Sequence, residues 1–192
     1  MLSIGDQFPQ FVLTACVSRH PHSAFRTVRS SDYDGKWLVC FFWPKAFTPV
    51  CATEIHDFGT LGPDFEEREA AVLGIGVESE FVYLAWTRQG PGPDDLPFPL
   101  LSDSRRRLVD AVGVLDQRDG VANRATFIVD PGLTIRHVSV NDFSVGRNPR
   151  EVLRILDALQ TDALCPSSWV KGQPTIASGV IFSERLSLGA QQ

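Results

Sequence analysis

The feature that most constrains the fold is an apolar run at residues 37–43, the longest uninterrupted one in the sequence. Such a length suits a buried strand and is far too short to cross a membrane. A loop containing Pro44 and Pro49 follows at once, and prolines fix the backbone and remove N–H donors. A helical pattern begins at about residue 50. The sequence therefore predicts a buried strand that leads through a stiff loop into a helix.

The rest of the chain alternates between strand-like and helical patterns. Further β-structure is expected at 71–77, at 98–101 and in a hairpin at 125–140. Helices are expected at 50–68, with a kink or a split at Pro63, and at 78–89, 102–112 and 149–160. Loops are expected at 18–35 and 90–97. This order predicts an α/β fold with a mixed central sheet between helices.

Composition and charge are those of an ordinary globular protein. The chain has 192 residues, of which 43% are apolar and 21% charged, and this is enough for one well-cored domain. Its net charge of -5 argues against a general nucleic-acid-binding surface. The first residues show neither the basic nor the apolar segment of a secretory signal. The expected location is therefore the cytoplasm.

The four cysteines, Cys16, Cys40, Cys51 and Cys165, differ in their surroundings. They form no Cys-x-x-Cys pair, and the histidines are not spaced with them as zinc ligands, so no metal site is expected. Cys40 lies inside the apolar run and Cys16 lies in another apolar segment, which is typical of small core residues. Cys51 and Cys165 are the two that this explanation does not cover.

Cys51 is expected in the first turn of the helix that follows the loop. Free N–H groups and a partial positive charge lie at a helix N-terminus. Cysteines in such places ionise more readily, and the thiolate is the nucleophilic form. Thr48 lies one helical turn earlier, where its hydroxyl could reach the sulfur or a substrate. Cys51 is therefore the candidate nucleophile.

The pattern Pro44-x-x-x-Thr48-x-x-Cys51 resembles the active-site signature of the peroxiredoxins. Its neighbours, Phe-Phe-Trp-Pro-Lys at 41–45 and Thr-Glu-Ile at 53–55, are similar to those of the alkyl hydroperoxide reductase C branch. The resemblance extends over roughly residues 3–172. It implies a thioredoxin-like fold with peroxiredoxin insertions over 1–160, and a C-terminal segment, 161–192, that carries a second cysteine. It also implies reduction of hydrogen peroxide and organic hydroperoxides without a cofactor.

The resemblance assigns roles to several other residues. Pro44 would shield the thiolate from water, Thr48 would bond to thiolate or peroxide, and Arg124 would hold both. From the residues alone, Arg124 is more simply an ordinary surface arginine. Glu54 and Arg147 would form a charge network behind the site, although Glu54 also suits the first turn of a helix. Trp86 would form an apolar collar near the pocket, or it simply packs in the core.

The segment Cys165-Pro166-x-x-Trp169 resembles the resolving-cysteine motif of the typical two-cysteine peroxiredoxins. The resemblance implies a disulfide between Cys51 and Cys165 of two subunits. It also implies a homodimer that pairs the edge strand at 133–140 and assembles into a ring. A dithiol donor would then reduce the disulfide: a thioredoxin-like protein, a flavoprotein reductase or another carrier.

Two other functions fit the same fold. The absence of Cys-x-x-Cys counts against a thiol–disulfide oxidoreductase. A redox-regulated chaperone built from rings of the same protein stays open as a second activity.

Resistance to overoxidation is a further expectation. Sensitive members of the resembled family carry a Gly-Gly-Leu-Gly loop and a C-terminal Tyr-Phe pair that pack over the site. The corresponding segments, 90–96 and 181–192, contain neither motif. We therefore expect the cysteine to be captured before a second oxidation.

Overall fold

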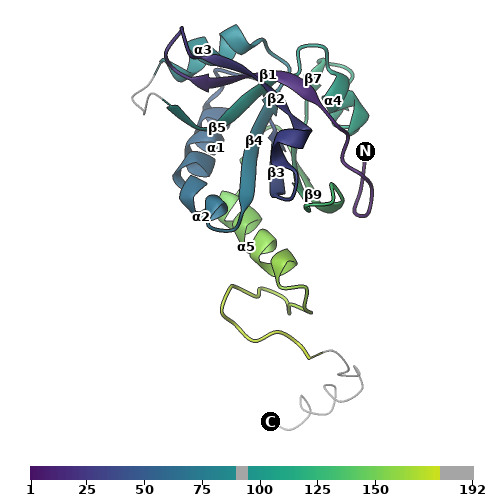
Figure 1. The fold of residues 1–192 in the computed structure, drawn as a ribbon. Helices are drawn as coiled ribbons and strands as arrows, with labels where there is room; N and C mark the ends of the chain where they lie inside the picture. Colours follow the sequence, from purple (N-terminus) through teal and green to yellow (C-terminus); the bar gives the residue numbers. More distant parts are fainter. Residues whose placement is uncertain (90–94, 178–192) are drawn as a thin grey trace. The chain divides into compact units, whose positions relative to one another are not determined.

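The structure is a computed structural model of the chain, and it describes residues 1–89 and 95–177 (Figure 1). The expected resistance to overoxidation depends on two segments that are not described. They are 181–192 and most of 90–96. The chain divides into two compact units, Met1–Pro149 and Arg150–Gln192, and each is described by itself. The domain boundary expected after residue 160 stays a prediction.

A mixed sheet of seven strands forms the first unit. The strands are β1 (Val12–Ser18), β2 (Phe25–Arg29), β3 (Trp37–Phe42), β4 (Ala70–Gly76), β5 (Asp95–Ser102), β8 (Arg124–Val129) and β9 (Ile135–Asn141). Their order is β2-β1-β5-β4-β3-β8-β9. β4 runs parallel to β3 and β5, and the other neighbours are antiparallel. The predicted mixed sheet is confirmed, and β6 (Leu115–Asp116) and β7 (Val121–Ala122) form a separate small ribbon.

Helices connect these strands. They are α1 (Pro49–Thr60), α2 (Gly62–Glu66), α3 (Glu80–Thr87) and α4 (Arg107–Ala111), and α5 (Pro149–Gln160) leads into the second unit. The predicted split at Pro63 is confirmed, because α1 ends at Thr60 and Pro63 lies in the first turn of α2. Among the described residues, no helix is long and apolar enough to cross a membrane.

β3 is buried on both faces, which explains its uniformly apolar sequence. Its alternate residues on one face join a core that β4, β5 and α4 share: Leu38, Cys40, Phe42, Leu73, Ile75, Leu101, Leu108 and Val109. The strand after which the Cys51 loop begins is therefore the rigid centre of the unit.

An aromatic cluster packs on the other face of the sheet, against α1 and α3. Phe41 stacks on Phe58 of α1 with ring centroids 4.3 Å apart, and Trp43 meets Tyr83 of α3 edge-on at 5.3 Å. Gly76 of β4 makes this packing possible, since a Cβ there would lie 2.5 Å from the Tyr83 hydroxyl oxygen. Both helices are thereby fixed against the strand that precedes the loop.

The predicted loop at 18–35 is wrong, because β2 lies within it and pairs with β1. β2 is an edge strand in which Val28 is buried, while Arg26, Thr27 and Arg29 are exposed. An edge strand with so little buried surface lacks the apolar alternation that predicts strands.

The segment between β5 and β6 also differs from its prediction. Helix α4 begins only at Arg107, because Asp103 first forms a turn and accepts hydrogen bonds from the Arg107 and Val109 amides at 3.0 and 2.8 Å. Arg106 takes a left-handed backbone conformation there, with φ 57°. The loop expected at 90–97 is shorter too, since β5 starts at Asp95, which is paired with Ser18 of β1.

In the second unit, the described residues after α5 are tied to that helix. Nη1 of Arg154 donates to the Trp169 carbonyl at 2.8 Å, and the Trp169 indole donates to the Gln173 carbonyl at 2.9 Å. Trp169 is buried, although it lies outside helix and strand. The segment around Cys165 is thus held by specific hydrogen bonds.

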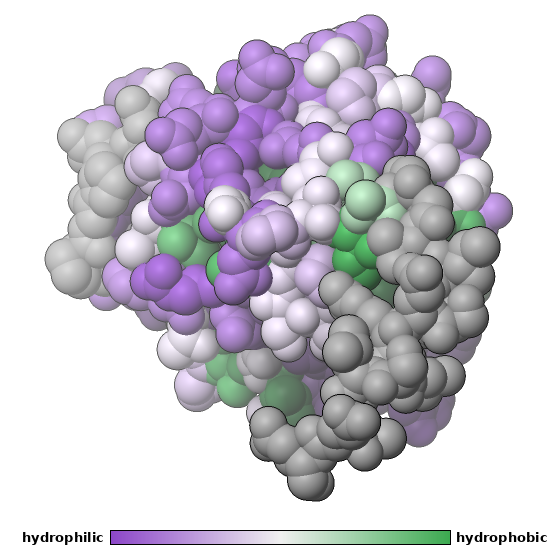
Figure 2. Space-filling view, turned by 90° about the horizontal axis from the view of Figure 1, so that it is seen from below, coloured by the Kyte–Doolittle hydropathy of each residue, from purple (hydrophilic) through white to green (hydrophobic). Residues whose placement is uncertain are grey.

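The surface agrees with the charged composition. On the face that Figure 2 shows, hydrophilic residues cover most of the described surface, and apolar residues show in small separate areas. Several large apolar side chains are exposed among the described residues, and Phe47 and Phe81 are two of them.

Candidate active site

Cys51 lies in the first turn of α1, as the sequence predicts. Thr48 is the N-cap residue and Pro49 the first helical residue, so Cys51 is the third residue of the helix. Its side chain is fully buried. The first turn of a helix carries N–H groups without helical partners and a partial positive charge, and both favour a thiolate over a thiol.

Arg124 brings a cation to the Cys51 sulfur. It is the first residue of β8, it is 2% exposed, and its Nη1 lies 3.5 Å from Cys51 Sγ. β8 pairs with β3, with Thr126 opposite Phe41, so that Arg124 lies near the end of β3 where the loop starts. Arg124 is therefore not a surface arginine, and a guanidinium at this distance stabilises a thiolate.

Glu54 follows Cys51 by one helical turn and is also 2% exposed. One carboxylate oxygen accepts from Arg124 Nη1 at 2.5 Å and from Arg147 Nη2 at 2.7 Å. The other accepts from the backbone N–H and the Nε of Arg147 at 2.8 and 3.0 Å. The predicted network of Glu54 and Arg147 is thus present, and Glu54 orients the arginine that faces the sulfur.

Arg147 ties this network to the sheet. Its Nη1 donates to the carbonyl oxygens of Phe42 and Ala125, each at 2.8 Å, and its guanidinium carbon lies 4.9 Å from the centre of the Phe41 ring. Burial lowers the pKa of Arg147 from its ordinary value, and the hydrogen bonds and charge of Glu54 oppose this change. An arginine stays protonated in proteins, so the site holds two guanidinium cations.

The charges of the site balance when Cys51 is a thiolate. Arg124 and Arg147 carry two positive charges, and Glu54 carries one negative charge. A thiolate supplies the second negative charge. Because buried charges are stable only when they are paired, an anion at the sulfur would complete the pairing of these two buried cations.

One donor of Arg124 has no partner. Its Nη2 donates to the Phe143 carbonyl at 2.7 Å, but its Nε is buried and, among the described residues, forms no hydrogen bond. Buried N–H groups are almost always paired. The partner of this N–H is therefore not supplied by the described residues.

The loop before α1 is strained. Phe47 adopts φ 61°, a left-handed conformation that costs a residue with a side chain about 1–2 kcal/mol. Two hydrogen bonds hold the loop: the Thr48 hydroxyl donates to the Lys45 carbonyl at 2.9 Å, and the Ala46 amide donates to Glu78 Oε1 at 2.6 Å. A bond from Thr48 to the thiolate or the peroxide stays a prediction, because this hydroxyl proton is used within the loop.

Two further predicted residues lie beside this loop. Pro44 is buried directly after β3, where it follows Trp43 into the loop. Trp86 of α3 is half-buried, and its ring centroid lies 6.1 Å from those of Trp43 and Phe47. Trp86 thus contacts both the sheet cluster and the loop, which agrees with an apolar collar as well as with core packing.

Sequence reasoning missed Glu78. Its position in the sequence could have indicated its role. Glu78 follows β4, which is parallel to β3, and the carboxyl ends of parallel strands lie at the same edge of a sheet. An acidic residue there lies beside the loop that follows β3.

The other cysteines differ from Cys51. Cys16 and Cys40 are fully buried, and burial raises the pKa of each thiol from its ordinary value. They are core residues, as predicted. Cys165 belongs to the second unit, is half-buried, and lies 3.4 Å from the Thr161 hydroxyl and 3.8 Å from the Ala158 carbonyl.

Comparison with known proteins identifies relatives of the whole chain. A model of the AhpC/TSA family matches residues 4–138. Alkyl hydroperoxide reductase C of Mycolicibacterium smegmatis is 52% identical over 191 residues, which cover 95% of this chain and 97% of that protein. Peroxiredoxin-2 of Macaca fascicularis is 42% identical over 184 residues, or 92% of this chain and 91% of that protein.

Solved structures give the same result. AhpC of Mycobacterium bovis is 51% identical with a TM-score of 0.80, over 88% of this chain and 98% of that one. The reduced 2-Cys peroxiredoxin of Plasmodium vivax is 30% identical with a TM-score of 0.86, over 97% of this chain and 100% of that one. The predicted thioredoxin-like peroxiredoxin fold is confirmed, and the chain belongs to the AhpC/TSA family.

Proposed function

We propose that Cys51 is the peroxide-reducing residue of this thiol-dependent peroxidase, which acts on hydrogen peroxide and organic hydroperoxides. One observation carries the proposal: a buried sulfur at a helix N-terminus has Arg124 Nη1 at 3.5 Å, and Glu54 fixes that arginine. The names of the relatives, alkyl hydroperoxide reductase C and peroxiredoxin, agree with it.

In the first step the Cys51 thiolate attacks one oxygen of the peroxide. The S–O bond forms, the O–O bond breaks, and both electrons of that bond leave with the second oxygen. Sulfur is oxidised by two electrons to a sulfenic acid, and the departing oxygen takes up a proton to become water or an alcohol. The unpartnered Nε of Arg124 is a donor suited to the oxygen on which charge develops.

In the second step the Cys51 sulfenic acid condenses with Cys165 of the partner subunit. The two sulfurs form a disulfide, and the sulfenic oxygen leaves as water. A disulfide needs Cα atoms within about 7 Å, and Cys51 is fully buried, so the Cys51 turn must open before the two sulfurs can meet. A dithiol carrier then returns both cysteines to the reduced state. The cytoplasmic location expected from the sequence stays a prediction.

Peroxide is expected to convert the protein into a disulfide-linked dimer. In this scheme Cys51 forms the sulfenic acid, and Cys165 of the partner subunit is the thiol that captures it. Non-reducing denaturing electrophoresis and peptide mapping measure the link. Cys165→Ser should abolish the dimer band while the first oxidation of Cys51 persists, and Cys16→Ala should leave the band unchanged. A peptide that joins Cys51 to Cys16 or Cys40 would contradict the assignment of Cys165.

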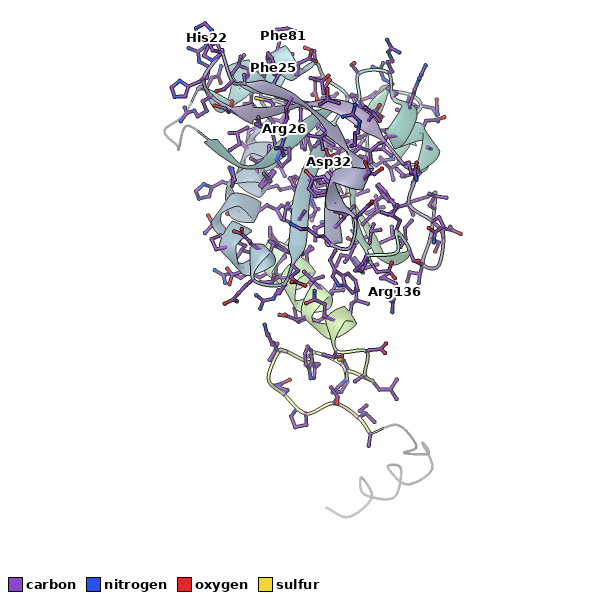
Figure 3. All side chains as sticks on the ribbon, viewed as in Figure 1. His22, Phe25, Arg26, Asp32, Phe81 and Arg136 are labelled. Atoms are coloured by element: carbon purple, nitrogen blue, oxygen red, sulfur yellow. The ribbon has the colours of Figure 1, made fainter. Side chains whose placement is uncertain are left out.

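A homodimer that assembles further into a ring is expected. β9 is an edge of the sheet, with Val140 44% exposed, and an edge strand can pair with its copy about a two-fold axis. A second exposed apolar side chain is that of Phe81 of α3, which is 65% exposed. The centroid of its ring lies 4.9 Å from that of Phe25 of β2 (Figure 3). Sedimentation should give the mass of a dimer or a multiple of it. A strictly monomeric mass in both redox states would exclude this assembly.

A further inference from the structure

Glu78 connects the Cys51 loop to α3 through both of its carboxylate oxygens. Oε1 accepts from the Ala46 amide at 2.6 Å, and Oε2 accepts from the Tyr83 hydroxyl at 3.0 Å. The Glu78 carbonyl accepts from the Ser102 hydroxyl at 2.7 Å, which fixes the backbone as well. Nothing in the peroxidase chemistry described above uses this residue.

Tyr83 fixes the direction of the Glu78 carboxylate. Its side chain is fully buried, and its ring packs edge-on against Trp43. Gly76 is required beside it, because a Cβ there would lie 2.5 Å from the hydroxyl oxygen. Burial, with the neighbouring Glu78 charge, raises the pKa of Tyr83 well above its ordinary value, so the phenol stays a neutral donor. The carboxylate is therefore aimed at the loop by a rigid group.

The loop that Glu78 holds is the one that must move. Ala46 directly precedes Phe47, whose left-handed backbone is strained, and Thr48, which caps the helix of Cys51. A hydrogen bond to a carboxylate is about twice as strong as one between neutral groups. Two further side-chain contacts join this loop to the rest of the unit among the described residues. The Phe47 and Trp86 rings lie 6.1 Å apart, and Lys45 forms an exposed ion pair with Asp119, a kind of pair that contributes little.

We propose that Glu78 and Tyr83 are positioning residues that hold the Cys51 loop closed and so set the fate of the sulfenic acid. The inference rests on the proposed function. In the closed loop, the sulfenic sulfur stays beside Arg124 and can attack a second peroxide. That O–O bond breaks with both electrons on the leaving oxygen, which is protonated, and sulfur is oxidised by two further electrons to a sulfinic acid. In the open loop, the sulfur is instead captured by Cys165 of the partner subunit.

Weakening this pair should therefore shift the outcome from the sulfinic acid to the disulfide. The measured quantity is the peroxide concentration at which half of Cys51 becomes sulfinic acid in one turnover, read by mass spectrometry of the intact chain. Glu78→Ala removes both hydrogen bonds and should raise this concentration about tenfold. Glu78→Gln keeps an oxygen for the Ala46 amide and should stay within about threefold of the wild type. Tyr83→Phe removes one hydroxyl and should fall between these two.

Asp119→Asn is the matched control, since it removes a carboxylate that contacts the same loop at its exposed side; it should leave the concentration unchanged. A folded Glu78→Ala or Tyr83→Phe protein with the wild-type value would overturn the inference, as would an equal shift in Asp119→Asn. If Glu78→Ala does not fold, Tyr83→Phe decides. If peroxide leaves Cys51 of the wild type unoxidised, the proposed function fails, and the inference fails with it.

Discussion

Replacing Cys51 with serine is expected to abolish peroxide reduction. A serine hydroxyl is not ionised at neutral pH, so neither the helix N-terminus nor Arg124 can convert it into an anionic nucleophile. The substitution is nearly isosteric, and the pair formed by Arg124 and Glu54 stays in place. Stopped-flow mixing with hydrogen peroxide should show no fast phase, and the peroxide should persist as it does in buffer.

Cys40→Ala provides the control for this result. Cys40 is also fully buried, but it packs in the apolar core, and burial raises the pKa of its thiol. A thiol in that setting is inert, so this variant should keep the wild-type rate while losing some stability through the small cavity. Fast peroxide reduction by Cys51→Ser would rule out the mechanism proposed above.

Replacing Arg124 with lysine is expected to slow the reaction of Cys51 with peroxide at least about 100-fold, which is the effect of losing one donor that stabilises developing charge. A lysine keeps the positive charge but not the planar group that contacts Cys51, Glu54 and Phe143 at once. The second-order rate constant from stopped-flow fluorescence measures the effect. Because the charge remains, the fold should tolerate this change.

Arg124→Ala separates chemistry from stability. It should show a similar or larger kinetic loss, and it should also lower the free energy of unfolding by about 3–5 kcal/mol, because one partner of a buried ion pair is removed. Urea unfolding measures this second effect. Arg118→Ala is the control, since that arginine is 89% exposed in its ion pair; it should leave the rate unchanged and lower the free energy of unfolding by about 1 kcal/mol at most. A near-wild-type rate in Arg124→Lys would show that the arginine does not act at the sulfur.

The sequence predicts the local parts of this molecule well and the long-range parts poorly. The apolar run that became β3, the split helix around Pro63 and the place of Cys51 all follow from periodicity, proline and helix-end chemistry. β2 was missed because an exposed edge strand carries little apolar signal.

The charge network behind Cys51 could not be found from local pattern. Glu54 bonds to Arg124 and Arg147, which are 70 and 93 residues away in the chain. No helical or strand period links positions so far apart. The family resemblance paired Glu54 with Arg147, and the bond from Arg124 to Glu54 became apparent only in the structure. The family resemblance did not indicate Glu78. Its contact with Ala46 depends on two parallel strands that end at the same edge of the sheet.

The charge count around Cys51 has a consequence for the oxidised enzyme. Two guanidinium groups face two anions only while the sulfur is a thiolate. A protonated sulfenic acid carries no charge, and one cation is then uncompensated in a site that is almost closed to water. An unpaired buried charge costs several kcal/mol, and hydration relieves that cost. Oxidation therefore leaves Arg124 and Arg147 with Glu54 as their shared buried carboxylate, so that the product of the first step lies in a site with an excess of positive charge.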